Sequence, residues 1–144
     1  MKRFLLVSYL ASRRAKPSWW SDSEWAGAEE LNTKALPHYY KAKVEADAVL
    51  YKVSNERGPG FIGIDLRPGT LTDAPSSGKV ELGKTKAASG KVSRESVARV
   101  ADLLLASEGV NNSWVDLVDG EEAIDAAVAR VVNEGVDAAE GEDF

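Results

Sequence analysis

The chain contains no cysteine and a single histidine, His38, in 144 residues. Without cysteine there is no disulfide framework, no thiolate metal site and no thiol nucleophile. One imidazole also excludes metal sites that are built from several histidines. We therefore predict no metal site, and the chemistry of any active site must come from other side chains.

The chain also lacks a basic patch and a long apolar run. Its net charge of -5 and pI near 5.0 argue against a nucleic-acid partner, because phosphates require clustered Lys and Arg. No apolar stretch approaches the roughly 20 residues that a membrane helix needs, so we expect no membrane span and a cytoplasmic protein. The apolar run 4–11 after Lys2 and Arg3 has two interpretations. It fits a strand buried on both faces, which we favour, or a short signal peptide.

Strand-like and helix-like segments alternate along the chain. Apolar runs predict three main strands over 4–10, 61–66 and 114–118, and a short strand over 79–82. Capping signals and apolar spacing predict helices over 21–33, from Pro37 to about 53, from Ser93 to about 105, and from Asp119 to about 131. This order predicts an α/β fold with a parallel sheet in one domain, 1–133. The acidic segment 134–144 predicts a disordered tail.

The second of these helices carries the residues with the clearest chemistry. Tyr39 and Lys43 lie one turn apart, so their side chains share a face. A nearby ammonium favours the phenolate, and such a tyrosine can donate or remove a proton while hydride passes to or from a cofactor. The alternative is a solvent-exposed pair that occurs by chance. On the same helix, an apolar stripe is expected to face the core: Ala42, Ala46, Val49, Leu50 and Val53.

Four segments together resemble the short-chain dehydrogenase/reductase superfamily, in its atypical NAD(P)H-binding branch with NmrA-like and epimerase-like members. They are Phe4–Ser8, His38–Asp47, Leu66–Asp73 and Gly90–Ala98, and the resemblance extends to about residue 132. It implies a Rossmann-like fold, NADP or NAD as cofactor, and a small-molecule substrate. The chain would form the C-terminal part of such a protein, with a truncated, partial sheet of about three main strands.

The resemblance implies roles for individual residues. Tyr39 would be the catalytic acid/base, and Lys43 would be its partner and bind the cofactor ribose. The segment Pro68, Gly69 and Thr70 would lie against the nicotinamide, with backbone groups contacting its carboxamide. Ser8 is the candidate for the active-site serine, although it could equally cap the strand end.

The chain departs from this family where the cofactor's other half would bind. None of its 12 glycines forms a Gly-x-Gly-x-x-Gly turn between a strand and a helix. Such a turn lets the backbone approach a pyrophosphate at a helix N-terminus. We therefore expect that this chain alone cannot bind the whole cofactor. The alternative is that a truncated chain of this kind uses no cofactor.

Three further side chains are candidates for substrate binding. Trp19 and Trp20 could line a pocket, although packing of a loop over the sheet is the more common role of such residues. Arg67 could reach a substrate carboxylate or phosphate, although a structural ion pair is at least as common. Asp65 interrupts an apolar strand, so it should lie at an edge or pair with a cation.

The sequence supports two functions. The first is the C-terminal part of an NAD(P)-dependent reductase or epimerase. The second is a cofactor-free binding or regulatory module on the same fold, or an isomerase or lyase that uses Tyr39. An exposed sheet edge could also produce a homodimer, because unpaired strands favour association.

Overall fold

The structure is a computed structural model that describes residues 2–144, and its centre is a mixed sheet of five strands. Their order is β1 (Lys2–Val7), β2 (Phe61–Pro68), β6 (Ser113–Asp119), β4 (Lys79–Gly83) and β7 (Glu122–Ala123). β1, β2 and β6 run parallel, whereas β4 is antiparallel to both of its neighbours. The predicted α/β fold is confirmed, and the three predicted main strands are the parallel ones.

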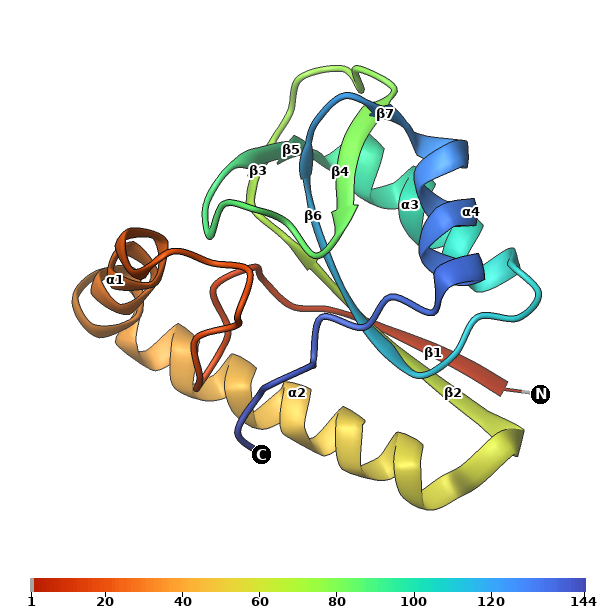
Figure 1. Cartoon of the computed structure of the whole chain (residues 1–144), viewed down its shortest axis with the longest axis horizontal. Coiled ribbons are helices and arrows are strands. Elements are labelled where there is room, and N and C mark those ends of the chain that lie inside the picture. Colours follow the sequence, from red (N-terminus) through yellow and green to blue (C-terminus); the bar gives the residue numbers. More distant parts are fainter. Residues whose placement is uncertain (1) are drawn as a thin grey trace.

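A small second sheet and four α-helices complete the fold (Figure 1). β3 (Thr70–Thr72) pairs in parallel with β5 (Lys91–Ser93). The helices are α1 (Asp22–Glu30), α2 (Pro37–Arg57), α3 (Arg94–Ala106) and α4 (Ile124–Glu134). Two short helices, η1 (Leu31–Ala35) and η2 (Gly58–Gly60), flank α2. Within residues 2–144 none of the helices has the length and apolar character needed to cross a membrane.

α3 and α4 cover one face of the sheet and form the main core with it. Ile64, Leu66, Val115 and Leu117 from the parallel strands are fully buried in this core. Figure 1 shows both helices on the same side of the sheet, opposite α2. Each fully buried aliphatic side chain stabilises the fold by roughly 1.5–3 kcal/mol, so this layer supplies most of the hydrophobic stabilisation.

α2 packs on the other face at very close range. A Cβ atom added to Gly63 would lie only 1.9 Å from the Ser54 hydroxyl, so this glycine permits the contact between α2 and β2. The residues of α2 that turn inward are Val44, Asp47, Leu50 and Ser54. The predicted apolar stripe is therefore largely wrong as a core face. Of its members only Leu50 is buried, and Val49 is 60% exposed.

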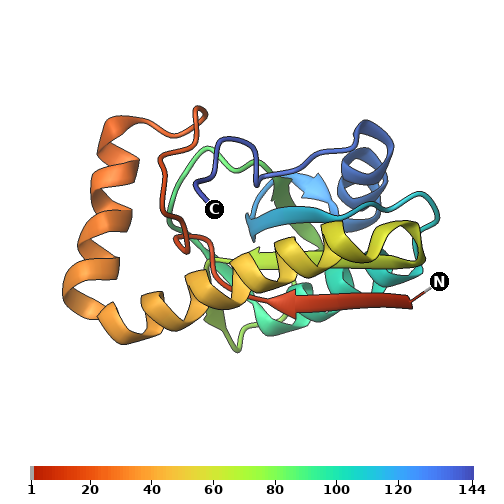
Figure 2. The same ribbon diagram turned by 90° about the horizontal axis from the view of Figure 1, so that it is seen from below.

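β1, like the predicted stripe of α2, is more exposed to solvent than predicted. Its pairing with β2 confirms the strand, but it lies at the edge of the sheet and is not covered on both faces. Phe4 and Val7 are 51% and 39% exposed. Figure 2 shows β1 at this edge with α2 running beside it. Apolar residues of β1 and α2 thus meet solvent together.

Helix boundaries follow local capping, with one exception. Ser21 caps α1 and Ser93 caps α3, each accepting a hydrogen bond from a backbone N–H three residues later. Pro37 begins α2, as predicted. The final helix begins at Ile124 and not at Asp119, because Asp119 still belongs to β6 and residues 122–123 pair with β4.

The acidic segment after α4 is packed against the sheet, which contradicts the predicted disordered tail. Ala138 is fully buried, and its N–H donates to the Trp114 carbonyl at 2.9 Å. The Phe144 ring stacks on Tyr51 at 3.8 Å between centroids. Arg13 also donates to the Ala138 carbonyl at 2.6 Å. Composition suggested disorder, but two small buried alanines and these hydrogen bonds hold the segment in place.

Deleting residues 136–144 should therefore destabilise the fold. The deletion exposes Trp114 and removes one of the partners of the buried Arg13 guanidinium, so we expect a loss of about 2–4 kcal/mol. Urea unfolding followed by tryptophan fluorescence measures this change. An unchanged midpoint would show that the segment adds nothing to the stability of the fold.

Candidate active site

A pocket of about 360 Å³ lies at the carboxyl ends of β1 and β2. In parallel sheets this edge is where ligands bind, because the connecting loops diverge there. The loop after β1 supplies one wall, η1 and α2 supply the second, and the loops around β3 and β5 supply the third. The lining residues are Ser8–Ala11, Leu31, Leu36, Tyr39, Pro68–Leu71, Ala88–Gly90 and Arg94.

Tyr39 lies in this pocket at the first turn of α2. Its side chain is 46% exposed, and its ring packs against that of Tyr9 with centroids 5.0 Å apart. Tyr9 is itself fixed, because its hydroxyl donates to the Asn32 side chain at 2.6 Å. Burial, together with the neighbouring Tyr40 and Tyr39, raises the pKa of Tyr9 far above its usual value. Of the two tyrosines, Tyr39 is the more exposed one at the pocket.

Lys43 lies beside Tyr39 but not in the wall of the pocket. Its Nζ is 5.4 Å from the centroid of the Tyr39 ring and donates to the Val7 carbonyl at 3.1 Å. That carbonyl is at the end of the edge strand β1. The ammonium thus lies between the pocket and the open edge of the sheet, with contacts to both.

Ser8 lines the pocket, and its hydroxyl is directed to Asp47. Ser8 Oγ donates to Asp47 Oδ2 at 3.1 Å, and Ser12 Oγ donates to the same oxygen at 2.6 Å. Both serines are buried. These bonds join the loop after β1 to the inner face of α2. Ser8 therefore has a structural partner in this chain, and a catalytic role for it stays a prediction.

Pro68, Gly69 and Thr70 form the floor between β2 and β3. The N–H groups of Gly69 and Thr70 donate to the carbonyls of Leu117 and Gly90, and the Pro68 carbonyl accepts from Leu10. The expected backbone donors to a carboxamide are thus already used within the chain. Thr70 remains exposed at the pocket, so its side chain is the polar group that this segment can offer to a ligand.

The three residues considered for substrate binding lie elsewhere. Trp20 is 2% exposed, and its indole N–H donates to the Thr85 carbonyl. Trp19 packs beside it against Lys84 and Arg13. Arg67 is fully buried in the charge cluster described below. None of them lines the pocket, so the structure gives all three a packing or ion-pairing role in place of the expected substrate contact.

Arg67 is the centre of a buried charge cluster under α2. Its Nη1 lies 3.0 Å from Asp47 and 3.7 Å from Asp65, and its Nε lies 3.2 Å from Asp116. Its remaining nitrogen donates to the Ser12 carbonyl. Its guanidinium also lies 3.9 Å from the centroid of Trp114. The cluster therefore joins α2, β2, β6 and the loop after β1.

Arg13 is the second cation of this cluster. It pairs with Asp116 at 3.3 Å, and its side chain is fully buried. Burial lowers the pKa of Arg13, while Asp116 opposes that effect. The pKa of Arg67 is raised, because the attraction of Asp65, Asp116 and Asp47 outweighs the effect of burial. Two guanidinium groups thus share three carboxyl groups.

Asp65 is the one carboxyl group of the three without a guanidinium partner at hydrogen-bond distance. Neither of its oxygens has a hydrogen-bond partner within residues 2–144. Burial raises the pKa of Asp65 well above its usual range, and the neighbouring Asp47 raises it further. A protonated Asp65 can donate its proton to Asp47. The cluster then holds two cations and two anions, which is the arrangement that a buried site tolerates best.

Several of these residues were not predicted from the sequence. Asp47 and Asp116 hold Arg67, while Tyr9 and Arg94 line the pocket. One signal was available: Asp65, Arg67 and Asp116 interrupt strands that are otherwise apolar. Charged residues at such positions must find one another, so they could have been predicted to pair across β2 and β6.

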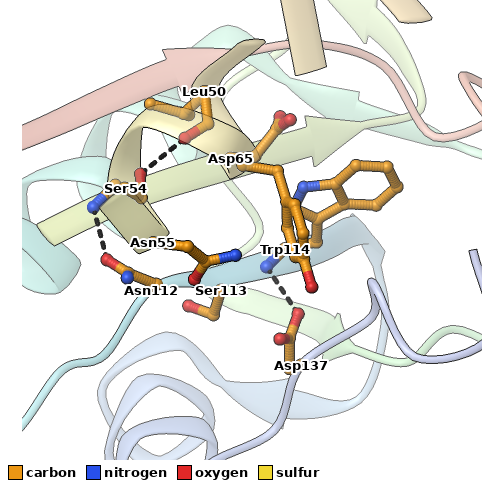
Figure 3. Close-up of a pocket in the computed structure, with 10 residues that line it drawn as sticks. Leu50, Ser54, Asn55, Asp65, Asn112, Ser113, Trp114 and Asp137 are labelled. Atoms are coloured by element: carbon orange, nitrogen blue, oxygen red, sulfur yellow. Dashed lines mark hydrogen bonds between the residues drawn. The ribbon is translucent and has the colours of Figure 1, made fainter. Parts of the chain in front are cut away.

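A second, smaller cavity of about 110 Å³ lies at the opposite end of the parallel strands (Figure 3). Its wall includes Asn112 just before β6, Ser113 at the start of β6, and Asp137 from the C-terminal segment. Figure 3 shows hydrogen bonds that tie this wall together, among them Trp114 N–H to Asp137 and Ser54 Oγ to the Leu50 carbonyl. This cavity is remote from Tyr39 and belongs to the packing of α2 and the C-terminal segment.

The structure is a Rossmann-like α/β fold with a pocket at the carboxyl edge of its sheet. Residues 1–108 match the sequence model of a family described as NAD(P)H-binding. The chain therefore belongs to this NAD(P)H-binding family. This result confirms the resemblance to atypical short-chain dehydrogenases/reductases.

Individual relatives agree with this family. The UPF0659 protein C216.03 of Schizosaccharomyces pombe is 30% identical over 94% of this chain and 53% of its own length. The uncharacterized sugar epimerase YhfK of Bacillus subtilis is 28% identical over 91% of this chain and 51% of its own length. The chain thus spans about half the length of the curated relatives that it matches.

The chain also spans about half the length of the solved structures that it resembles. The oxidoreductase ylbE of Lactococcus lactis is similar with a TM-score of 0.66 and 25% identity, over 92% of this chain and 52% of that one. A putative NAD-dependent epimerase/dehydratase of Bacillus halodurans has a TM-score of 0.62 and 22% identity, over 92% and 51%. The second similarity shows the fold alone.

Replacing Asp65 by asparagine should stabilise the protein at neutral and alkaline pH. Because the pKa of Asp65 is raised in the folded state, its contribution to stability is complete below the pKa of an unfolded aspartate, about 3.9, and is lost as pH rises through the folded pKa. Asp65→Asn keeps the neutral group and removes that loss. We expect a gain of at least about 1 kcal/mol at pH 8 and a flatter pH profile.

The matched control is Asp116→Asn, which removes an anion that both guanidinium groups need. It should destabilise the fold by about 3–5 kcal/mol. Urea unfolding at several pH values between 5 and 9 distinguishes the two variants. A wild-type protein that is more stable than Asp65→Asn at pH 8 would contradict a neutral Asp65.

Proposed function

We propose that this chain is the proton-handling, C-terminal part of an NAD(P)-dependent reductase or epimerase-like protein. One observation carries the proposal: a single pocket at the carboxyl edge of the sheet brings Tyr39 together with Pro68, Gly69 and Thr70. The family match and the similarity to an oxidoreductase and to a sugar epimerase support it.

Tyr39 would donate a proton to, or remove one from, the oxygen of a substrate carbonyl or hydroxyl group. The half-exposed ring is open to the pocket, and its position is fixed by packing against Tyr9. Lys43 would supply positive charge next to this ring and bind ribose hydroxyl groups through an ammonium that reaches the Val7 carbonyl. When bound, a nicotinamide would exchange hydride with the substrate carbon.

The residues present fit one half of the cofactor. Tyr39 and Thr70 line the place where a nicotinamide riboside would lie, Lys43 lies beside Tyr39, and the pocket of about 360 Å³ can take a small ring. For the pyrophosphate, residues 2–144 contain no glycine-rich turn between a parallel strand and a helix N-terminus. The adenosine half of the cofactor would thus gain little affinity from this chain.

A second candidate function is a cofactor-free binding module, or an isomerase or lyase that uses Tyr39. The apolar walls of the pocket favour this second function. Leu31, Leu36, Leu71 and Ala88 give the pocket apolar walls that come entirely from this chain. A small organic ligand could therefore bind without any nucleotide-binding segment.

Comparing the reduced mononucleotide with the whole dinucleotide tests the primary proposal. We expect reduced nicotinamide mononucleotide and NADH to bind this chain with equal affinity, because the adenosine half has no site. Quenching of tryptophan fluorescence during titration measures both dissociation constants. NADH that binds more than tenfold tighter, a difference of about 1.4 kcal/mol, would show an adenosine site in this chain. If neither ligand binds, the chain has no independent oxidoreductase activity and the cofactor-free function is favoured.

Two substitutions test the assigned roles. Lys43→Met keeps the length of the side chain but removes its charge, so mononucleotide affinity should fall roughly tenfold. Tyr39→Phe should leave thermal stability nearly unchanged, because the side chain is half exposed, and should abolish proton transfer to any substrate. If both variants match the wild type in ligand binding, turnover and stability, the site is wrongly placed for either candidate function.

A further inference from the structure

The pocket at Tyr39 carries one formal charge, and it is positive. Among the residues of the described chain that line this pocket, Arg94 is the only charged one, and none is an aspartate or glutamate. The chain as a whole has a net charge of -5, so its composition does not lead one to expect a pocket with positive charge alone. A concave site lined by one sign of charge attracts ligands of the opposite sign.

Arg94 and Tyr39 reach the pocket from elements on opposite faces of the sheet. Arg94 is the first residue of α3, and Tyr39 lies in the first turn of α2. These two helices cover different faces, as Figure 1 shows. The segment Pro68–Thr70, at the end of β2, lines the same pocket. A ligand that contacts both side chains therefore extends across the strand ends.

The guanidinium of Arg94 is available to a ligand. Within residues 2–144 its one ion-pair partner is Asp73, and the two side chains are 57% and 91% exposed. Exposed ion pairs of this kind contribute little to stability, so a ligand anion can replace or share Asp73 at low cost. The neighbouring Glu95 carboxylate accepts a hydrogen bond from the Ser76 N–H at 2.8 Å and does not bind Arg94. Arg67, in contrast, is fully buried among its partners.

The same pocket contains apolar side chains that are open to solvent. Leu31, Leu36 and Leu71 line it and are 36%, 36% and 39% exposed. They come from η1, from the start of α2 and from β3, so they converge on the pocket from separate elements. Apolar walls with a few polar groups at defined places are typical of small-molecule sites. The walls favour a ligand that has an apolar body and polar ends.

We propose that the substrate of this pocket is a small carboxylic acid that also bears a carbonyl or hydroxyl group. Its carboxylate pairs with Arg94, and its carbonyl or hydroxyl oxygen lies at Tyr39. The Tyr39 end of this inference rests on the proposed function, whereas the Arg94 end rests on the charge of the pocket alone. Arg94 is thus a residue that determines specificity.

Charge balance favours a carboxylate over a phosphate. The planar fork of a guanidinium matches the two oxygens of a carboxylate, and such bidentate pairs are among the stronger hydrogen bonds. A carboxylate carries one negative charge, which one guanidinium compensates. A phosphate monoester carries about 1.5 to 2 negative charges at neutral pH, so part of its charge would stay uncompensated in a pocket with one cation.

Two ligands that differ only in charge test the proposal. β-Benzoylpropionate is a ketone with an apolar ring and a carboxylate, and β-benzoylpropionamide is its neutral counterpart. Titration of ¹⁵N-labelled protein at low salt gives both dissociation constants from amide shifts. The acid should bind roughly tenfold more tightly than the amide. The shifts should include Thr70, Gly90 and Arg94, which line the pocket.

Variants of Arg94 and its neighbours identify the cause of this preference. Arg94→Gln should bind acid and amide equally. Arg99→Gln removes the same charge from an exposed position of α3 outside the pocket, so it should keep the preference of the wild type. Asp73→Asn frees the guanidinium of its competing carboxylate and should strengthen binding of the acid about twofold. Thermal unfolding checks that all three variants keep the fold, because each replaced side chain is exposed.

Several results would overturn the proposal. They are equal binding of acid and amide, no binding of either, an equal loss in Arg94→Gln and Arg99→Gln, and phenyl phosphate that binds more tightly than the acid. Reduced nicotinamide mononucleotide should bind Arg94→Gln as it binds the wild type. A tenfold loss would assign Arg94 to the nucleotide phosphate and overturn the substrate class. If the acid binds through Arg94 but the mononucleotide does not bind, the proposed cofactor function fails and the carboxylate site stands.

Discussion

The buried guanidinium of Arg67 is the interaction on which the rest of the structure depends. It binds Asp47 of α2, Asp116 of β6 and the backbone of the loop after β1 at the same time. Removing one charge from such a cluster leaves the others buried without compensation, at about 3–5 kcal/mol. Arg13 extends the cluster to the C-terminal segment through the Ala138 carbonyl. Four parts of the chain that are distant in sequence are thereby fixed to one another.

The cluster also sets the orientation of α2, and with it the candidate site. Tyr39, Lys43 and Asp47 follow at intervals of four residues, so each lies about 40° further around the helix than the one before. Asp47 is buried against Arg67, Lys43 is partly exposed at the strand edge, and Tyr39 reaches the pocket. A single helix thus carries the buried anchor Asp47 and the candidate site residues Lys43 and Tyr39 along one gradually rotating side.

The sequence predicted the main parts of the fold because its strongest signals are local. Apolar runs located the parallel strands, and Ser21, Pro37 and Ser93 located the starts of three helices. It failed where a distant partner decides the outcome. The stripe through Val49 has helical spacing, yet Asp47 and Ser54 turn inward. Arg67 donates a hydrogen bond to Asp47, and Gly63 leaves space for the Ser54 side chain. The segment 134–144 has a disordered composition, but Trp114 and Arg13 bind it.

The candidate site was predictable in part for the same reason. Tyr39, Lys43 and Pro68–Thr70 come from a family resemblance in the order of segments, and the structure brings Tyr39 and Pro68–Thr70 into one pocket. For Arg67 the sequence left a substrate contact and a structural ion pair open, because a lone arginine near a strand end looks alike whether it faces a ligand or three carboxyl groups; the structure shows the ion pair. Only the register of β2 with β6, which places Arg67 opposite Asp116, distinguishes these cases.

The pocket at Tyr39 is the ligand site that we propose for this chain. Mapping of backbone amide shifts in a ¹⁵N-labelled protein during addition of reduced nicotinamide mononucleotide tests this site. We expect shifts at Tyr9, Tyr39, Thr70 and Gly90, with Gly63 and Asn112 at the opposite end of the strands unchanged. Shifts confined to Gly63, Asn112 and their neighbours, or no shifts at saturating ligand, would contradict it.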